Sequence, residues 1–401
     1  MNSVIIWGAG KNLQTVFDSI NLCNSKILAI IDNCENKQKQ KWMGIEIYSS
    51  KIIQDIEFDY IIISPFRYED IYKECLSLGV DDKKIIIFWN NAEKYDFLVK
   101  YPKENYLLKK ENEELKLKLQ NYRFELGLEP VPVIAESGEL LKKMLFDRSS
   151  LCRFGDGEFE MMRMKERPWF QNCNIELAKR LKEVLASRND KINIAIANNY
   201  SSLERYTDIS ANNIRKYLSG GTREFHMKLI DLDRKYYDGY VTRPYLIYKN
   251  KDYCKEIFHL WKEIFKNRNL LIVEGKYSRF GVNNDFLSSA SSIKRIFCPA
   301  QNAYNVYSDI KKNVLNYINQ NDLVLISLGP TATILAFDLA KEGCQAIDIG
   351  QVDNEYEWYL RQSDRQIPIA GKGIAETSDG RIPKDEIDLS QYNSECLAII
   401  E

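Results

Sequence analysis

Histidine is scarce in this 401-residue sequence, and its cysteines form no paired motif. Only two histidines occur, His226 and His259, which argues against a histidine-based catalytic triad and against a multi-histidine metal site. The nine cysteines lie singly between Cys23 and Cys396, without a CxxC pair. That spacing argues against a zinc site and predicts reduced thiols in a cytoplasmic protein. Acid–base and metal chemistry should therefore depend mainly on Asp and Glu.

Long apolar runs and an excess of one charge are also absent. No apolar stretch approaches the ~20 residues of a membrane span, and the first residues lack the basic region of a signal peptide. The 56 basic and 57 acidic residues leave a net charge of -1, so neither nucleic acid nor an anionic membrane is an expected partner. The length predicts two or three domains of an ordinary globular protein.

The first segment, residues 1–101, alternates short apolar strands with helical patterns. Strands are expected in "SVIIW", "KILAII", "FDYIIIS" and "KKIIIFW", and helices after "GAG" and around "YEDIYKECLSLG". Such alternation is typical of a parallel, doubly wound sheet. The segment is therefore predicted to be a Rossmann-like domain.

A glycine turn follows the first of these strands. Gly8 and Gly10 match the first two glycines of the dinucleotide fingerprint, the third is missing, and Asp32 stands where a ribose-binding acid would lie. A helix that begins after such a turn favours a phosphate at its N-terminus. Gly8, Gly10 and Asp32 therefore form either a second nucleotide site or a turn that only packs the helix tightly on the strand.

A charged stretch, "KENYLLKKENEELKLKLQNYRFEL", predicts a helical linker over residues 102–130. Its apolar side chains recur at spacings of seven, four, three and four and share one helical stripe: Leu108, Leu115, Leu119, Tyr122 and Leu126. The stripe would pack on a neighbouring domain or, alternatively, join two copies of the chain in a homo-oligomer.

Residues 131–401 again mix strands and helices and form a larger α/β unit. Strands are expected in "SSLCRF", "INIAIA", "NLLIVEG", "IKRIFCP", "DLVLISLG" and "QAIDIG". Helical patterns cover Ile175 to Ser187, Tyr253 to Lys266, Ala303 to Tyr317 and Thr331 to Glu342. The predicted fold class is α/β, with two Rossmann-like parallel-sheet domains joined by a helical linker.

Two carboxylates follow the strand "SSLCRF". Asp156 and Glu158 stand two residues apart, and in an extended or turning backbone both would point to one side. Such a pair suits Mg²⁺ or Mn²⁺, and Arg153 suits a phosphate. The alternative is a solvated Asp-Gly turn. The position at a strand end favours a ligand site.

The turn after "DLVLIS" predicts a second part of this ligand site. Gly329 and Pro330 make the turn, and Thr331 and Thr333 fall in the first turn of the next helix. Free N–H groups and hydroxyls there would cradle a diphosphate.

The stretch "QVDNEYEWYL" follows the next strand and alternates acidic with aromatic residues. Asp353 and Glu355, beside Tyr356 and Trp358, would hold a sugar, because aromatic faces and carboxylates both bind carbohydrates. The alternative is a helix start with its acids near the N-terminal dipole.

Three further stretches, "TRPYLIY", "VEGKYSRFGVNNDFL" and "KRIFCPAQNAY", each predict a strand that ends in a polar loop. They bring Arg243, Arg279 and Arg295 to one sheet edge and add Asn302 as a candidate contact. Three arginines at strand ends favour an anionic ligand, although each would serve equally as a salt-bridge partner.

Several of these stretches together resemble a known family. "RFGDGE", "RPY", "VEGKYSRFGV", "RIFCPAQNAY" and "LGPTATILAFDLAKEGCQAIDIGQVDNEYEW" resemble the GT-D-type glycosyltransferases, bacterial enzymes that extend glycans on serine-rich adhesins and in related surface pathways. The resemblance spans about Ala135 to Gln362. It leaves out residues 1 to about 130, an added Rossmann-like module.

The resemblance implies a GT-D-like catalytic domain and a metal-dependent glycosyltransferase of the hexosyltransferase type. Its donor would be a nucleotide sugar, typically UDP-linked, and its acceptor a glycan, a glycoprotein or a lipid-linked sugar. A divalent metal, Mn²⁺ or Mg²⁺, would be held by a DxE motif that falls on Asp156 and Glu158. The pyrophosphate would lie near Gly329, Pro330 and Thr331.

One position departs from the family pattern. A histidine commonly follows the "DIG" strand, and Gln351 stands there, which would weaken a contact to metal or phosphate or mark a divergent acceptor. With so little histidine, a carboxylate must act as the base of an inverting transfer, and the candidates are Glu355, then Asp353. Two alternatives stay open: an NAD(P)-dependent or nucleotide-sugar-modifying Rossmann enzyme, and a non-catalytic nucleotide-sugar-binding interaction protein.

Overall fold

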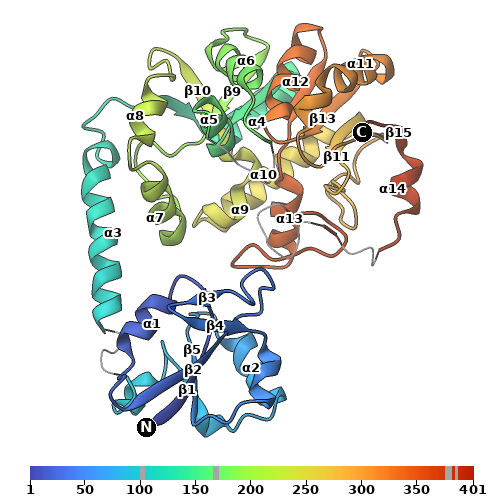
Figure 1. Cartoon of the computed structure of the whole chain (residues 1–401). Helices are drawn as coiled ribbons and strands as arrows, with labels where there is room; N and C mark the ends of the chain where they lie inside the picture. Colours follow the sequence, from blue (N-terminus) through green and yellow to red (C-terminus); the bar gives the residue numbers. More distant parts are fainter. Residues whose placement is uncertain (100–103, 166–170, 375–381, 384–386) are drawn as a thin grey trace. The chain divides into compact units, whose positions relative to one another are not determined.

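The chain divides into two units, Met1–Lys116 and Leu117–Glu401, each with its own sheet (Figure 1). The computed structural model describes residues 1–99, 104–165, 171–374, 382–383 and 387–401. The boundary between the units falls within helix α3 (Glu104–Glu125), where the sequence predicts a linker helix.

The smaller unit is built on a six-stranded sheet, counted over the described residues, in the order β3-β4-β2-β1-β5-β6. Its strands are parallel except for β3, which is antiparallel to β4. The elements are β1 (Asn2–Trp7), α1 (Leu13–Ser19), β2 (Ser25–Ile31), β3 (Lys41–Trp42), β4 (Ile45–Tyr48), β5 (Tyr60–Ile63), α2 (Glu69–Ser77) and β6 (Ile85–Ile87).

Strand β1 shows why this sheet is covered on both faces. Val4 and Ile6 join one buried apolar cluster, whereas Ile5 and Trp7 join another. Successive strand residues point to opposite faces, so a run that is apolar throughout needs a core on each side. The predicted doubly wound arrangement is thereby confirmed.

The larger unit contains a nine-stranded sheet within the described part of the chain, in the order β15-β12-β11-β13-β14-β8-β9-β10-β7. Every neighbouring pair is parallel. The strands are β7 (Val133–Ala135), β8 (Ser150–Phe154), β9 (Ile192–Ile196), β10 (Lys235–Asp238), β11 (Asn269–Gly275), β12 (Ser292–Cys298), β13 (Leu323–Ser327), β14 (Gln345–Asp348) and β15 (Cys396–Ile399).

Helices connect these strands and cover the sheet (Figure 1). They are α4 (Ser137–Asp147), α5 (Asp156–Met162), α6 (Ile175–Ala186), α7 (Asp208–Tyr217), α8 (Thr222–Met227), α9 (Pro244–Ile247), α10 (Lys251–Phe265), α11 (Tyr307–Tyr317), α12 (Pro330–Lys341), α13 (Val352–Leu360) and α14 (Ser390–Ser394). Helix α12 is the most enclosed, because Pro330 to Ala340 are all buried, as expected of a helix that is apolar around its whole circumference.

The position of β8 determines where a ligand can bind. On one side it pairs with β9, the next strand in sequence, and on the other with β14, which comes nearly two hundred residues later. Such a change of direction opens a crevice at the carboxyl ends of the strands. Among the helices that the structure describes, none combines the length and apolarity of a membrane span.

Candidate functional site

A cavity of about 1370 Å³ lies in the larger unit at the carboxyl ends of its central strands. It is lined by the segments that follow β8, β9, β10, β11, β13 and β14. Small-molecule pockets usually measure ~300–1,000 Å³, so this one has room for more than one ligand group.

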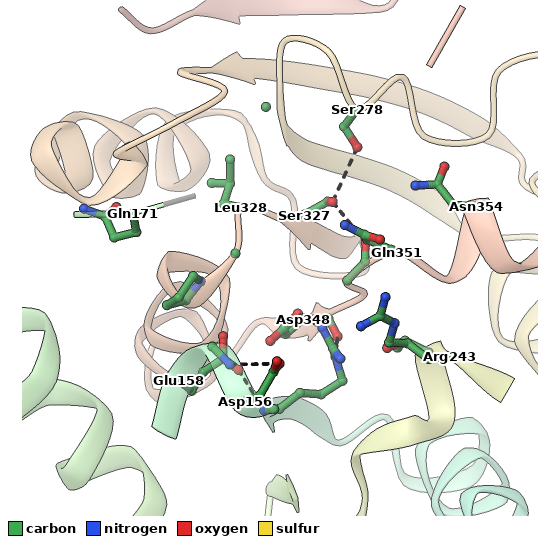
Figure 2. Close-up of a pocket in the computed structure, with 18 of the residues that line it drawn as sticks. Asp156, Glu158, Gln171, Arg243, Ser278, Ser327, Leu328, Asp348, Gln351 and Asn354 are labelled. Atoms are coloured by element: carbon green, nitrogen blue, oxygen red, sulfur yellow. Dashed lines mark hydrogen bonds and ion pairs between the residues drawn. The ribbon is translucent and has the colours of Figure 1, made fainter. Parts of the chain in front are cut away.

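The two ends of the cavity differ in charge. Figure 2 shows Asp156, Glu158, Asp348 and Arg243 gathered in one part, and Ser278, Ser327 and Asn354 in the other. The hydroxyls of Ser278 and Ser327 lie 3.4 Å apart, and Ser327 donates a hydrogen bond to the carbonyl of Gly350 at 3.0 Å.

The paired carboxylates lie on a helix rather than on an extended corner. Asp156 is the first residue of α5 and Glu158 the third, and residues two apart on a helix point roughly 200° away from each other. Asp156 is exposed at the cavity, whereas Glu158 turns back and accepts the N–H of Gly155 at 2.7 Å. The expectation of two parallel side chains is wrong, because the helix begins directly after the strand.

Glu158 is a perturbed acid. Its burial, with the nearby Asp348 carboxylate, raises its pKa to about 7, although the N–H of Gly155 and the Arg153 guanidinium act in the opposite direction. Sequence reasoning missed Asp348, although its position as the last residue of β14 is a signal that could have found it.

Arg153 joins strand β8 to Asp348 of β14 at this end of the cavity. Its Nη2 forms an ion pair with Asp348 Oδ1 at 2.9 Å, and its Nε donates to the Asp348 carbonyl at 3.0 Å. Its side chain also lines the cavity. The guanidinium therefore presents positive charge to a ligand from a fixed position.

The Gly-Pro turn reaches the cavity, but the threonine hydroxyls do not. Gly329 and Pro330 line it, whereas Thr331 and Thr333 are fully buried. The Thr333 hydroxyl hydrogen-bonds to the carbonyl of Arg153 at 2.9 Å and to Asp348 Oδ2 at 3.1 Å. The predicted hydroxyl cradle is thus withdrawn from the cavity, because α12 is enclosed on all sides and the buried Thr331 hydroxyl finds no hydrogen-bond partner among the described residues.

The three downstream arginines are not gathered at one edge. Arg243 lines the cavity, but "TRPYLIY" is helical: Arg243 lies between the 3-10 helix η4 (Gly239–Thr242) and α9. Pro244, at the first position of α9, explains the difference, since proline favours that position.

Arg279 and Arg295 are buried and lie outside the cavity lining. Arg279 donates to the carbonyl of Gly371 at 2.9 Å. Arg295 lies within β12 and pairs with Glu274 at 2.7 Å and with Glu395 at 2.6 Å. Both guanidiniums are therefore occupied by the fold itself.

Asn302 also serves the fold in this structure. Its Oδ1 accepts the N–H of Asn172 at 2.8 Å, and Asn302 has the left-handed φ of 57° that asparagine tolerates. It does not line the cavity.

Asp353 and Glu355 both line the cavity, from the first turn of α13. Asp353 accepts hydrogen bonds from Asn284 at 2.7 Å and from the buried Lys372 ammonium. Glu355 accepts the N–H groups of Tyr245 at 2.8 Å and Leu246 at 3.1 Å, so it caps α9. The stretch is a helix start, as in the alternative interpretation.

The aromatic neighbours of these acids belong to the core. Trp358 is fully buried, and its indole donates to the carbonyl of Ile367 at 2.9 Å. Tyr356 is also buried, and its hydroxyl donates to Asp285 at 2.6 Å. Neither ring presents a face to the cavity lining.

Gln351 lies at the start of α13 and lines the cavity. Its Oε1 is buried and finds no hydrogen-bond partner among the described residues. An amide oxygen in that state is suited to accept a hydrogen bond from a ligand or a water molecule.

In the smaller unit, the Asp32 carboxylate occupies the glycine loop that follows β1. Asp32 accepts the N–H of Ala9 at 2.8 Å and pairs with Lys37 at 3.0 Å. Gly8 has a φ of 114°, and its carbonyl accepts the Ser64 hydroxyl at 2.7 Å. A carboxylate thus takes the loop N–H that a phosphate would need, which speaks against the NAD(P)-dependent alternative.

The larger unit carries the family signature. Residues 151–377 match the model of the glycosyltransferase GT-D fold, and residues 1–86 match a C2185-like N-terminal domain. The first match covers more than half of the chain. The chain therefore belongs to the GT-D-fold glycosyltransferases, as the sequence resemblance implies.

Two curated relatives come from streptococci. The chain is 36% identical over 239 residues to the probable glycosyl transferase Gly of Streptococcus gordonii, which is 59% of this chain and 34% of that protein. It is 33% identical over 277 residues to glycosyltransferase GlyD of Streptococcus pneumoniae, which is 68% of this chain and 33% of that protein. The chain thus spans about a third of the length of these relatives.

Solved structures show the same fold. One, described as a domain of unknown function with a distinct glycosyltransferase fold, has a TM-score of 0.64 and 32% identity over 72% of this chain and all of that one. Another, described as a new glycosyltransferase from Streptococcus sanguinis, has a TM-score of 0.62 and 31% identity over 68% of this chain and all of that one. The predicted fold class and glycosyltransferase class are confirmed.

Proposed function

We propose that the chain transfers a sugar from a nucleotide-sugar donor, UDP-linked, to a glycan or glycoprotein acceptor, with Mn²⁺ or Mg²⁺ at Asp156. The observation that carries the proposal is the position of Asp156. It is exposed to the cavity at the turn from β8 into α5, beside the fixed pair of Arg153 and Asp348. A carboxylate and an arginine at the strand ends suit a cation and a diphosphate together.

The residues fit a cation that is shared with the substrate. Within the part of the chain that the structure describes, no group of three or more His, Cys, Asp or Glu side chains could hold a metal ion. Mg²⁺ usually takes one or two protein carboxylates and completes its shell with phosphate oxygens and water. Asp156 would supply that protein share, and the bound cation would neutralise charge on the leaving diphosphate.

Arg153, Arg243 and the start of α12 would bind the diphosphate. Both arginines line the cavity, as do Gly329 and Pro330 at the helix N-terminus. The backbone N–H groups there carry partial positive charge, which favours an anion. These groups would stabilise the negative charge that develops as the sugar leaves.

For an inverting transfer, Glu355 is the better of the two candidate bases. Both oxygens of Asp353 are engaged, one by Asn284 and the other by the Lys372 ammonium. Glu355 faces the cavity with one oxygen bound to two backbone N–H groups. A base must reach the acceptor hydroxyl, and Glu355 lines the cavity in which that hydroxyl would lie.

The acceptor would lie toward α7 and α9. Ser210, Asn213 and Tyr217 line the cavity from α7, and Leu246 and Ile247 line it from α9. The amide, hydroxyl and apolar groups of these residues suit the hydroxyls and ring faces of a neutral glycan. The nine cysteines are free, which fits our proposal of a cytoplasmic reaction.

Hydrolysis and transfer with a panel of UDP-, GDP-, CDP- and ADP-sugars test the proposal. The full chain with Mn²⁺ should cleave one UDP-sugar, and Asp156→Ala should reduce that rate at least ~100-fold, the size of effect that removing a charge-stabilising group has on catalysis. Turnover that survives both chelation of Mn²⁺ and Asp156→Ala would remove the proposed role of this residue.

A further inference from the structure

Helix α3 carries an apolar stripe that the structure leaves uncovered. Its members are exposed by 56%, 53%, 75%, 55% and 56%: Leu108, Leu115, Leu119, Tyr122 and Leu126, in that order. Each of the five keeps more than half of its surface exposed. A row of large apolar side chains in water marks an interaction surface rather than a solvated helix face.

The other side of α3 is fixed to the larger unit. Glu125 forms two hydrogen bonds to Arg215, at 2.7 and 2.8 Å, and Asn121 accepts from Arg223 at 2.7 Å. The Arg223 guanidinium also lies 4.1 Å from the ring centre of Phe124. These contacts hold the C-terminal half of the helix in one rotation, so its part of the stripe faces outward.

The stripe follows the heptad pattern of a coiled coil. Successive core positions are separated alternately by four and three residues, and one of them is polar. The core positions are Leu108, Asn112, Leu115, Leu119, Tyr122 and Leu126. Asn112 would take an a position, where a single asparagine fixes register and favours two strands. An exposed asparagine within an apolar row therefore points to a defined dimer rather than to an unspecific apolar patch.

Charges beside the stripe favour two parallel helices. The e positions are all basic, Lys109, Lys116 and Arg123, and would face each other and repel in an antiparallel pair. In a parallel pair, Glu111 would instead face Lys116 of the second copy. Lys118 would face Arg123, but Arg123 already pairs with Glu129 at 2.5 Å within its own chain, which offsets that repulsion.

We propose that α3 binds a second copy of this chain, forming a homodimer through a parallel two-stranded coiled coil. The two stripes would cover each other, and the two copies of Asn112 would pair across the seam. The association places two identical transferase units on one assembly. It is independent of the donor and metal proposed above.

Sedimentation equilibrium of the full chain tests the proposal. The wild type should be a dimer, and the double variant Leu119→Glu/Tyr122→Glu should weaken association at least ~100-fold, because it places charge in an apolar seam. Phe146→Glu is the matched control: Phe146 is 84% exposed and lies outside the stripe, so this variant should remain dimeric. A monomeric wild type, a double variant that still dimerises, or a monomeric control would each overturn the proposal.

Asn112→Leu gives an independent test of register. At a core position the apolar substitution should tighten association about tenfold or more and admit oligomers larger than two. If Asn112 instead lay on a free surface, Asn112→Leu would leave association unchanged. That result would contradict the assigned heptad. Circular dichroism of each variant shows whether it is folded.

Discussion

Lys372 is a buried ammonium that depends on two carboxylates of α13. Its side chain has no exposed surface, and its Nζ contacts Asp353 and Glu357, the latter at 3.3 Å. Asp353→Asn should lower the free energy of unfolding by about 3 kcal/mol, since removing one partner leaves a buried charge poorly compensated. Urea unfolding followed by fluorescence measures the difference.

Asp364→Asn is the control for that measurement, because Asp364 is an exposed acid just beyond the end of α13. It should change stability by less than about 0.5 kcal/mol. If Asp353→Asn kept full stability but lost transfer, Asp353 would belong to the chemistry and not to the fold.

His226 is held neutral in the core beside the cavity. It stacks on Phe159 at 3.9 Å between ring centres, and its two ring nitrogens lie 2.8 Å from the Tyr200 hydroxyl and 3.3 Å from the Tyr217 hydroxyl. Burial, with Arg163 and Arg223 nearby, lowers its pKa to about 3, and only Asp156 acts in the opposite direction.

This depressed pKa makes stability depend on pH. Below pH ~6.5 the unfolded chain protonates His226 while the folded chain does not, so stability should fall as the pH drops from about 6.5 toward 3. The stability advantage of the wild type over His226→Gln should shrink by up to ~1.4 kcal/mol per pH unit in this window. Parallel curves for wild type and His226→Gln would contradict the burial argument.

At the scale of elements, the turn from β14 to α13 has no room for a side chain at position 350. Gly350 has a φ of 53°, and a Cβ added there would lie 2.2 Å from Arg153 Nη2 and 3.2 Å from the Thr242 hydroxyl. Gly350→Ala should therefore displace Arg153 from Asp348 and reduce transfer by at least about tenfold, because misplaced groups lose charge stabilisation.

Gly343→Ala separates this effect from backbone strain. Gly343 has a φ of 88° and no atom within 4 Å of an added Cβ, so alanine there meets only the left-handed penalty of ~1–2 kcal/mol. Steady-state kinetics should show near-normal transfer for Gly343→Ala. Equal losses in the two variants would mean that strain, and not Arg153, limits the reaction.

The strands of the sheets were predictable from sequence, whereas the side-chain directions around the site were not. In "NLLIVEG" the residues Leu270 to Val273 are all apolar because both faces of a parallel sheet are covered, and the whole stretch is β11 residue for residue. The directions of Asp156 and Thr333 depend on where a helix begins, which the pattern leaves uncertain by a few residues.

The ion-pair partners of the candidate site arginines could not be predicted from the sequence either. Arg295 and Arg153 follow similar apolar runs, yet one is enclosed by Glu274 and Glu395 and the other faces the cavity. Both have a partner far along the chain, Asp348 for Arg153 and Glu395 for Arg295. What separates them is burial, because the Arg153 side chain keeps 17% of its surface exposed and the Arg295 side chain 3%. Local residue types predict an anion site, but the fold decides which cation remains available to it.

At the scale of the whole molecule, each unit has its own buried core. Differential scanning calorimetry should therefore resolve two transitions, since units with separate cores need not unfold together. UDP with Mn²⁺ should raise only the transition of the larger unit, because a ligand stabilises the unit that binds it. A shift confined to the smaller unit would place the nucleotide in the glycine loop instead.

Calorimetric titration of UDP into the full chain, with Mn²⁺ and with a chelator, tests the assignment of Asp156 most directly. Binding should require the metal, and Asp156→Ala should weaken it at least ~10-fold, because the cation loses an exposed ligand and the diphosphate loses the cation. Asp364→Asn should bind as the wild type does. UDP affinity that is unchanged by both the chelator and Asp156→Ala would contradict a metal-assisted nucleotide-sugar site at the end of β8.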